Sequence, residues 1–228
     1  SKKNKNTKDF NVHMCFLGNP GTGKTEVARI ISRILYEAGV LEEAKLIETN
    51  TNGLIGQYVG ETGPKTQAKI NEAIGGVLFI DEAYALAGTD SSSCSTSYGD
   101  EAISVLLKEM EDKRGQFCAI LAGYEEPMKR MLALNPGFES RIQFTLHFPD
   151  YTREELSQIM ELVLKKKGYT ITEEAAARVL DITDIERSKP NYANARTLRN
   201  VLDQVIMNQN LRTEDSGNNE ITIKDVED

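Results

Sequence analysis

The stretch GNPGTGKT, Gly18 to Thr25, constrains the fold of this chain more than any other part of its sequence. It matches the pattern G-x-x-x-x-G-K-[ST], follows the apolar run VHMCFL and opens a segment of helical periodicity. A glycine-rich loop between a strand and a helix points backbone amides at phosphate oxygens, and the helix N-terminus adds positive potential. The sequence therefore predicts a nucleotide-phosphate site on an α/β fold. The dinucleotide pattern G-x-G-x-x-G is not met.

Each position of this loop has an expected role. The amides of Gly21, Gly23 and Lys24 are expected to face the phosphates, because glycine tolerates the backbone angles that this requires. Lys24 is expected to reach the β and γ phosphates of ATP, and Thr25 to ligate Mg²⁺. The predicted nucleotide contacts are Gly18, Asn19, Pro20, Gly21, Thr22, Gly23, Lys24, Thr25 and Glu26.

The first 150 residues alternate short apolar runs with helical patterns, which predicts a doubly wound, mainly parallel five-stranded sheet covered on both sides. The expected strands are 12–17, 45–50, 76–81, 118–123 and 144–148, and the expected helices are 24–38, 65–74, 100–112 and 126–133. Residues 151–228 show helical patterns alone and predict a small all-helical subdomain. Thr152 and Glu155 form a capping-box signature at its start.

Two carboxylates follow the apolar run GGVLFI. Asp81 is expected at the carboxyl end of a buried strand, where ligands bind in open α/β sheets, and can complete the Mg²⁺ shell with Thr25. Glu82 could polarise an attacking water. The pair favours hydrolysis of ATP over transfer of its phosphate to another acceptor.

Composition excludes several other classes. The net charge of −8 disfavours a nucleic acid or an anionic membrane as the main partner. The place of the basic cluster 165–167 at a helix end favours a structural role, and a binding patch is the alternative. No run of eighteen apolar residues is present, so a cytoplasmic protein is expected. Cys15, Cys94 and Cys118 fit neither a disulfide framework nor a zinc site, and Cys15 and Cys118 are expected in the core.

Together these motifs resemble the AAA+ ATPase family. The segments LIGQYVGET, GGVLFIDEAYAL, YGDEAISVLLKEME, ILAGYEEPM, NPGFESRI, FPDYTREEL and NARTLRNVLD are similar to the branch of stage V sporulation protein K and the red-type Rubisco activase. The resemblance implies a homo-oligomeric ring, usually a hexamer, that binds ATP between subunits and acts on a protein substrate.

The resemblance also implies roles for two arginines. Arg141 matches the arginine finger that reaches the γ phosphate of a neighbouring subunit, although a plain surface arginine is the alternative. Arg196 matches the sensor-2 arginine of the helical lid, and Arg199 could take its place.

A further set of positions follows from the same resemblance. Tyr58 and Val59 match a pore loop that grips polypeptide; core packing of Tyr58 is the alternative. Residues 88–97 could form a second pore-facing loop. At the sensor-1 position the family carries Asn or Thr, whereas this chain has Gly123 and Tyr124, so Tyr124 is a candidate for orienting the water.

Two other functions share the same core chemistry. One is a nucleic-acid motor or clamp-loader-like ATPase, which the acidic balance and Tyr58 disfavour. The other is a nucleotide-gated scaffold without turnover, which Glu82 disfavours. Only 11 residues precede the first expected strand, whereas the family usually has an upstream helical segment, so the chain is expected to be an excised domain.

Overall fold

The computed structural model describes residues 11–87, 94–212 and 219–227, which divide into two compact units. The first unit contains the described residues up to Gly18 together with Lys24–Phe148. The second contains Asn19–Gly23 together with the chain from Pro149 onward. The centre of the glycine-rich loop therefore makes its contacts in the second unit, although its two ends belong to the first.

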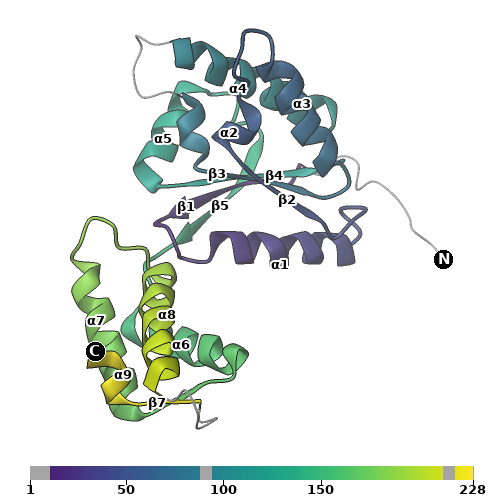
Figure 1. Cartoon of the computed structure of the whole chain (residues 1–228). Helices are drawn as coiled ribbons and strands as arrows, with labels where there is room; N and C mark the ends of the chain where they lie inside the picture. The colour runs from purple at the N-terminus through teal and green to yellow at the C-terminus, as the bar shows by residue number, and fades with distance from the viewer. Residues whose placement is uncertain (1–10, 88–93, 213–218, 228) are drawn as a thin grey trace, which may run out of the picture. The chain divides into compact units, whose positions relative to one another are not determined.

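The first unit is built on a parallel sheet in the order β2-β3-β4-β1-β5 (Figure 1). The strands are β1 (His13–Gly18), β2 (Leu46–Asn50), β3 (Val77–Asp81), β4 (Cys118–Gly123) and β5 (Ile142–Phe148). All five lie where the apolar runs predict them, within two residues at each end. The central strands are apolar throughout because both of their faces are covered.

Helices cover the two faces of this sheet unequally. α1 (Lys24–Glu37) lies on one face, and α2, α3, α4 and α5 lie on the other (Figure 1). The bounds on that other face are α2 (Thr51–Leu54), α3 (Thr62–Ala73), η2 (Ala83–Ala87), α4 (Cys94–Asp112) and α5 (Glu125–Leu134). α4 begins six residues before the expected helix, and α2 and η2 were not predicted.

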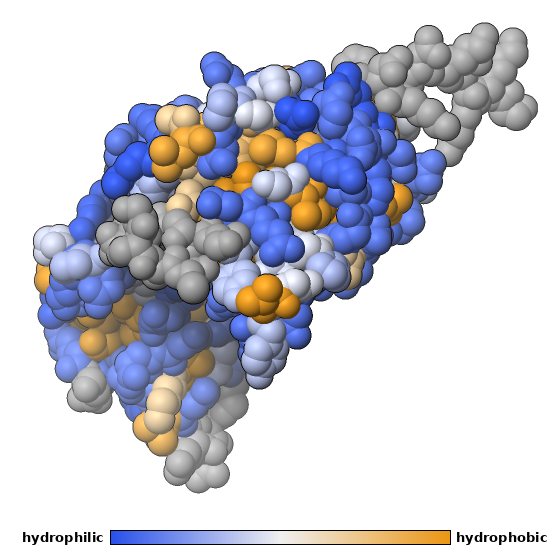
Figure 2. Space-filling view, turned by 90° about the horizontal axis from the view of Figure 1, so that it is seen from above, coloured by the Kyte–Doolittle hydropathy of each residue, from blue (hydrophilic) through white to orange (hydrophobic). Residues whose placement is uncertain are grey.

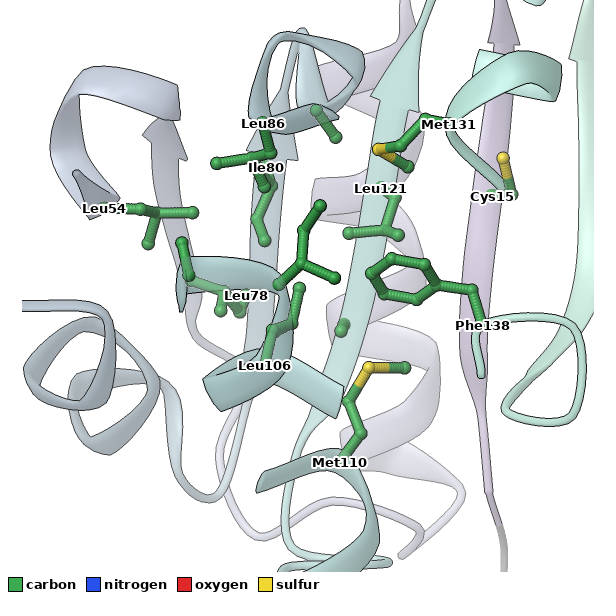
Figure 3. Close-up of a cluster of buried hydrophobic side chains, with 14 of the residues drawn as sticks. Cys15, Leu54, Leu78, Ile80, Leu86, Leu106, Met110, Leu121, Met131 and Phe138 are labelled. Atoms are coloured by element: carbon green, nitrogen blue, oxygen red, sulfur yellow. The ribbon is translucent and has the colours of Figure 1, made fainter. Parts of the chain in front are cut away.

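Alternation along the strands divides the core into two layers. Cys15 of β1 and Leu78 of β3 pack with Leu106 of α4 and Phe138, as Figure 3 shows. Phe16 and Phe79 point to the opposite face and pack with α1. Cys15 and Cys118 are buried core residues as predicted, and burial raises the pKa of the Cys15 thiol to about 12.

The second unit is mainly helical and has its own core. Its elements are α6 (Arg153–Lys167), β6 (Thr170–Ile171), α7 (Glu173–Arg187), α8 (Ala195–Arg212), β7 (Glu220–Ile221) and α9 (Ile223–Glu227). The capping box of Thr152 and Glu155 starts α6 as predicted. The two-residue strands β6 and β7 pair in parallel, a feature that the sequence analysis did not foresee.

Most of the face shown in Figure 2 is hydrophilic, with hydrophobic residues in separate groups. No helix among the described residues is long and apolar enough to cross a membrane.

Candidate functional site

The candidate site is built at the carboxyl ends of four neighbouring strands. β1 ends at Gly18, β2 at Asn50, β3 at Asp81 and β4 at Gly123. Because the strands are parallel, their ends meet at one edge of the sheet, where ligands bind in open α/β folds. The register pairs Asn50 with Asp81 directly across β2 and β3.

A polar cavity of about 460 Å³ opens at this edge within the first unit. It is lined by Thr25, Glu48, Thr49, Asn50, Phe79, Asp81 and Glu82. Thr25, Asp81 and Glu82 are the three residues that the sequence predicts for metal ligation and water activation, and the fold brings them together. Asn50 was not predicted; its side chain caps α2 by accepting a hydrogen bond from the Gly53 amide at 3.2 Å.

The lysine of the glycine-rich loop lies at the start of α1. The Lys24 ammonium donates to the Gly18 carbonyl at 2.9 Å, and its side chain is mostly buried. A Cβ atom at Gly18 would lie 2.3 Å from the Phe148 carbonyl oxygen, so only glycine fits where β1 passes β5. Glu26 is exposed in the first turn of α1.

Glu82 has an unusual backbone conformation. Its φ is +51°, and Asn194 is the other non-glycine residue of positive φ in the described part of the chain. Its amide donates to the Asp81 carboxylate at 3.0 Å, and its carbonyl accepts from the Thr51 hydroxyl at 3.4 Å. A left-handed conformation costs roughly 1–2 kcal/mol for such a residue, and such strain is concentrated at functional sites.

Two tyrosines lie beside these carboxylates. Tyr124 is the N-cap of α5, and its ring centroid is 5.8 Å from that of Tyr84. Burial raises the pKa of Tyr84, and the negative charges of Glu82 and Asp81 add to the shift. Tyr84 was not predicted as a site residue, although its place three residues after Asp81 was a usable signal.

The centre of the loop, Asn19–Gly23, is bonded to residues of the second unit. The Asn19 amide group donates to Asp150 Oδ1 at 2.9 Å. The Tyr151 hydroxyl donates to the Thr22 carbonyl at 3.0 Å. Burial raises the pKa of this hydroxyl, so it stays a donor at neutral pH. Asp150 and Tyr151 were not predicted as site residues.

The two candidate sensor-2 arginines are on α8. Arg196 is exposed, and its backbone amide donates to the Ala193 carbonyl at 2.9 Å. Arg199 is exposed as well, and its charge lowers the pKa of Tyr151 in opposition to burial. Both arginines therefore remain candidates.

Arg141 lies away from the glycine-rich loop. It precedes β5, whose first residue pairs with His13 and whose last pairs with Gly18. At about 3.3 Å per residue, the strand separates Arg141 from the loop by roughly 20 Å. The guanidinium donates to the Gly137 carbonyl at 2.9 Å and pairs with Glu111 at 3.3 Å.

Tyr58 and Val59 project from the loop between α2 and α3. Their side chains are 70% and 87% exposed, so core packing does not explain Tyr58. The backbone beneath them is ordered, because the Glu61 carboxylate accepts the amides of Gln57 and Tyr58 at 3.1 Å each. Of the possible second loop, residues 88–93 lie outside the described part of the structure.

Comparisons with known proteins agree with this geometry. Residues 14–150 match the model of the ATPase family associated with various cellular activities (AAA), and residues 152–228 match an AAA lid domain. A CfxQ homolog of Galdieria sulphuraria is 43% identical over 94% of this chain and 70% of its own length. The chloroplastic ribulose bisphosphate carboxylase/oxygenase activase of Cyanidioschyzon merolae is 44% identical over 87% of this chain and 67% of its own.

A solved structure supports the fold independently. A Thermotoga maritima RuvB mutant superimposes with a TM-score of 0.65 at 20% identity, over 94% of this chain and 60% of that one. The chain thus spans less than two thirds of that protein. With the AAA model covering more than half of its residues and a lid model covering residues 152–228, this chain belongs to the AAA ATPase family, in the branch of the CfxQ proteins and the red-type Rubisco activase.

Proposed function

We propose that this chain is the Mg²⁺-dependent ATP-hydrolysing module of a ring-forming machine that remodels or threads a protein substrate. The observation that carries the proposal is the cavity where Thr25, Asp81 and the left-handed Glu82 meet at the end of the glycine-rich loop. Thr25 and Asp81 offer the hard oxygen ligands that Mg²⁺ takes in combination with substrate phosphates. The metal would supply charge neutralisation at the phosphates.

The residues of this chain supply the rest of the chemistry in the proposal. Lys24 neutralises charge on the β and γ phosphates, and Glu82 orients a water for in-line attack on the γ phosphorus. Tyr124 corresponds to the position where the family carries its sensor-1 residue, and the ring of Tyr84 lies beside it; we assign both tyrosines the task of shaping the water position. Arg196 or Arg199 contacts the γ phosphate from the lid.

Glu82→Gln tests hydrolysis. We expect loss of most phosphate release, because the amide cannot polarise water, with ATP binding kept. Glu42→Gln, an exposed control in the loop after α1, should leave turnover unchanged. Turnover in Glu82→Gln at the rate of an active wild type would contradict the role of Glu82, whereas a wild type that binds ATP without turnover would favour a scaffold.

The ring proposal rests on Arg141, whose distance from its own loop suits a role in a neighbouring subunit. Lys24→Ala and Arg141→Ala should each be inactive alone. Their mixture should regain activity, since a site formed by the intact loop of one variant and the Arg141 of the other is complete. No recovery in mixtures that co-assemble would refute supply from a neighbour.

The proposal of a protein substrate rests on the loop that carries Tyr58 and Val59. Its backbone is held by hydrogen bonds to Glu61, and its aromatic side chain is exposed. An unfolded polypeptide should stimulate hydrolysis, and Tyr58→Ala should abolish the stimulation while basal turnover stays. The name of the Cyanidioschyzon relative, a ribulose bisphosphate carboxylase/oxygenase activase, makes Rubisco the first folded protein to test. Stimulation by DNA instead of polypeptide would favour the nucleic-acid alternative.

A further inference from the structure

Three consecutive carbonyl groups of the glycine-rich loop accept hydrogen bonds from residues after Pro149, within the second unit. The Asn194 amide group donates to the Pro20 carbonyl at 3.3 Å. The backbone amide of Ala195 donates to the Gly21 carbonyl at 3.2 Å, and the Tyr151 hydroxyl donates to the Thr22 carbonyl at 3.0 Å. We call these three donors the carbonyl brace.

Asn194 is itself fixed by the residues around it. Its side chain has no exposed surface, and its φ is +48°, a conformation that Asn tolerates better than most residues. Its Nδ2 also donates to Asp150 at 2.8 Å, and its Oδ1 accepts the Tyr151 amide at 3.0 Å. Both hydrogen-bonding ends of the side chain are therefore used, so its orientation is set.

Packing around the loop is equally close. A Cβ atom at Gly21 would lie 1.9 Å from the Ala193 carbonyl oxygen, and one at Gly23 would lie 2.8 Å from the Tyr151 hydroxyl. These two glycines therefore let the loop approach the brace, in addition to any need for open space beside a phosphate.

The geometry of the peptide bond relates these carbonyl contacts to the direction of the loop amides. In a planar trans peptide, the carbonyl of one residue and the amide of the next point in opposite directions. Holding the carbonyls of residues 20 to 22 on the side of the brace therefore directs the amides of Gly21, Thr22 and Gly23 to the other side. The amides of Gly21 and Gly23 are two of the three that the sequence predicts to face the phosphates.

We propose that Asn194 and Tyr151 are positioning residues that aim the loop amides of Gly21, Thr22 and Gly23 at the nucleotide phosphates. The proposal rests on the nucleotide site of the proposed function. It assigns to the lid a share of phosphate affinity that is separate from any contact of Arg196 or Arg199 with the γ phosphate. ADP, which lacks that phosphate, is consequently the informative ligand.

Tyr151→Phe and a matched control test the hydroxyl of the brace. Tyr151→Phe removes the donor to Thr22 and keeps the ring. Tyr169→Phe makes the same chemical change in the same unit, where the hydroxyl donates to Asn210 at 2.9 Å away from the loop. ADP affinity, measured by titration of a fluorescent ADP analogue, should fall about fivefold for Tyr151→Phe and stay unchanged for Tyr169→Phe.

Asn194→Gly tests the side chain while keeping the left-handed backbone. We expect ADP to bind about tenfold more weakly, because the amide of Gly21 loses its restraint and Tyr151 loses one partner. Adenosine, used as a competitor, has no phosphate and should bind within about twofold of wild type. The unfolding midpoint without nucleotide is measured in parallel for every variant.

The outcomes separate this inference from the proposed function. If wild type and Lys24→Ala bind ADP equally, the nucleotide site itself is wrongly placed. If Lys24→Ala loses ADP but Tyr151→Phe and Asn194→Gly bind it like wild type, the brace does not position the loop. If ADP and adenosine weaken together, in step with the unfolding midpoint, the residues are only structural and the inference is overturned.

Discussion

Gly21 offers a direct measure of how closely the loop packs against the lid segment. Its φ is +72°, and an added Cβ would lie 1.9 Å from the Ala193 carbonyl oxygen. Gly168, the C-cap of α6, has a φ of +78° and nothing within 4 Å of the same added atom. Both glycines lie in the second unit and have nearly the same φ, so alanine at each position brings a similar backbone strain and the two differ in the contact.

The expected costs follow from that difference. Gly168→Ala should lower the free energy of unfolding by about 1 kcal/mol, the cost of a left-handed alanine. Gly21→Ala has the same strain, and Ala193 must also move by about 1.5 Å to reach an ordinary contact distance. That shift breaks the bond from Ala195 to Gly21 and overpacks the site, so the total should be about 3 kcal/mol.

Urea denaturation followed by circular dichroism, without nucleotide, measures both values. The two values can be compared if the free energy of unfolding changes with urea concentration by the same slope in both variants and in the wild type. If Gly21→Ala is no less stable than Gly168→Ala, the loop is not in contact with Ala193 and the argument for the carbonyl brace loses its basis.

Two further predictions concern the first unit. The Leu106 side chain has no exposed surface, so Leu106→Ala should lower the free energy of unfolding by about 3 kcal/mol. As a control, Leu162→Ala changes a side chain that is 67% exposed on α6 and should cost less than about 0.5 kcal/mol. Similar losses for the two variants in urea denaturation would contradict the assigned core. Burial lowers the pKa of His13 to about 4 from 6.5, so the unfolded chain takes up a proton first as the pH falls. This residue's contribution to stability is complete above pH 6.5 and should fall by about 2 kcal/mol between pH 7 and pH 5. His13→Asn keeps an acceptor for the Ala119 amide, and its free energy of unfolding should fall by about 2 kcal/mol less than that of the wild type between pH 7 and pH 5. The same pH dependence in variant and wild type would refute the assignment.

The parallel sheet could be predicted because its signal is local and strong. The strands β1, β3 and β4 are largely apolar runs bounded by polar or glycine-rich segments, and the run VLFI before Asp81 is buried along its whole length. The same runs placed Thr25, Asp81 and Glu82 at one edge of the sheet without any structural information. Their meeting in one cavity follows from parallel strands alone.

Other features left no such signal. α2 is four residues long and contains Gly53, too short for a helical period to show. β6 and β7 are two residues each and pair across about 50 positions of sequence, which no local pattern reveals. The brace also escaped prediction, because nothing in the segment NARTLRN marks Asn194 as a buried residue that bonds to the backbone near position 20.

The division of the glycine-rich loop between two units also bears on how freely such modules can be exchanged. The helical unit is continuous in sequence from Pro149 onward except for Asn19–Gly23, which lie far upstream. A helical unit transplanted between relatives would leave those five residues behind, and with them the acceptors of Asn194, Ala195 and Tyr151. Because these acceptors are main-chain carbonyls, a transplanted helical unit would depend on the backbone path of the recipient's loop and not on its side chains.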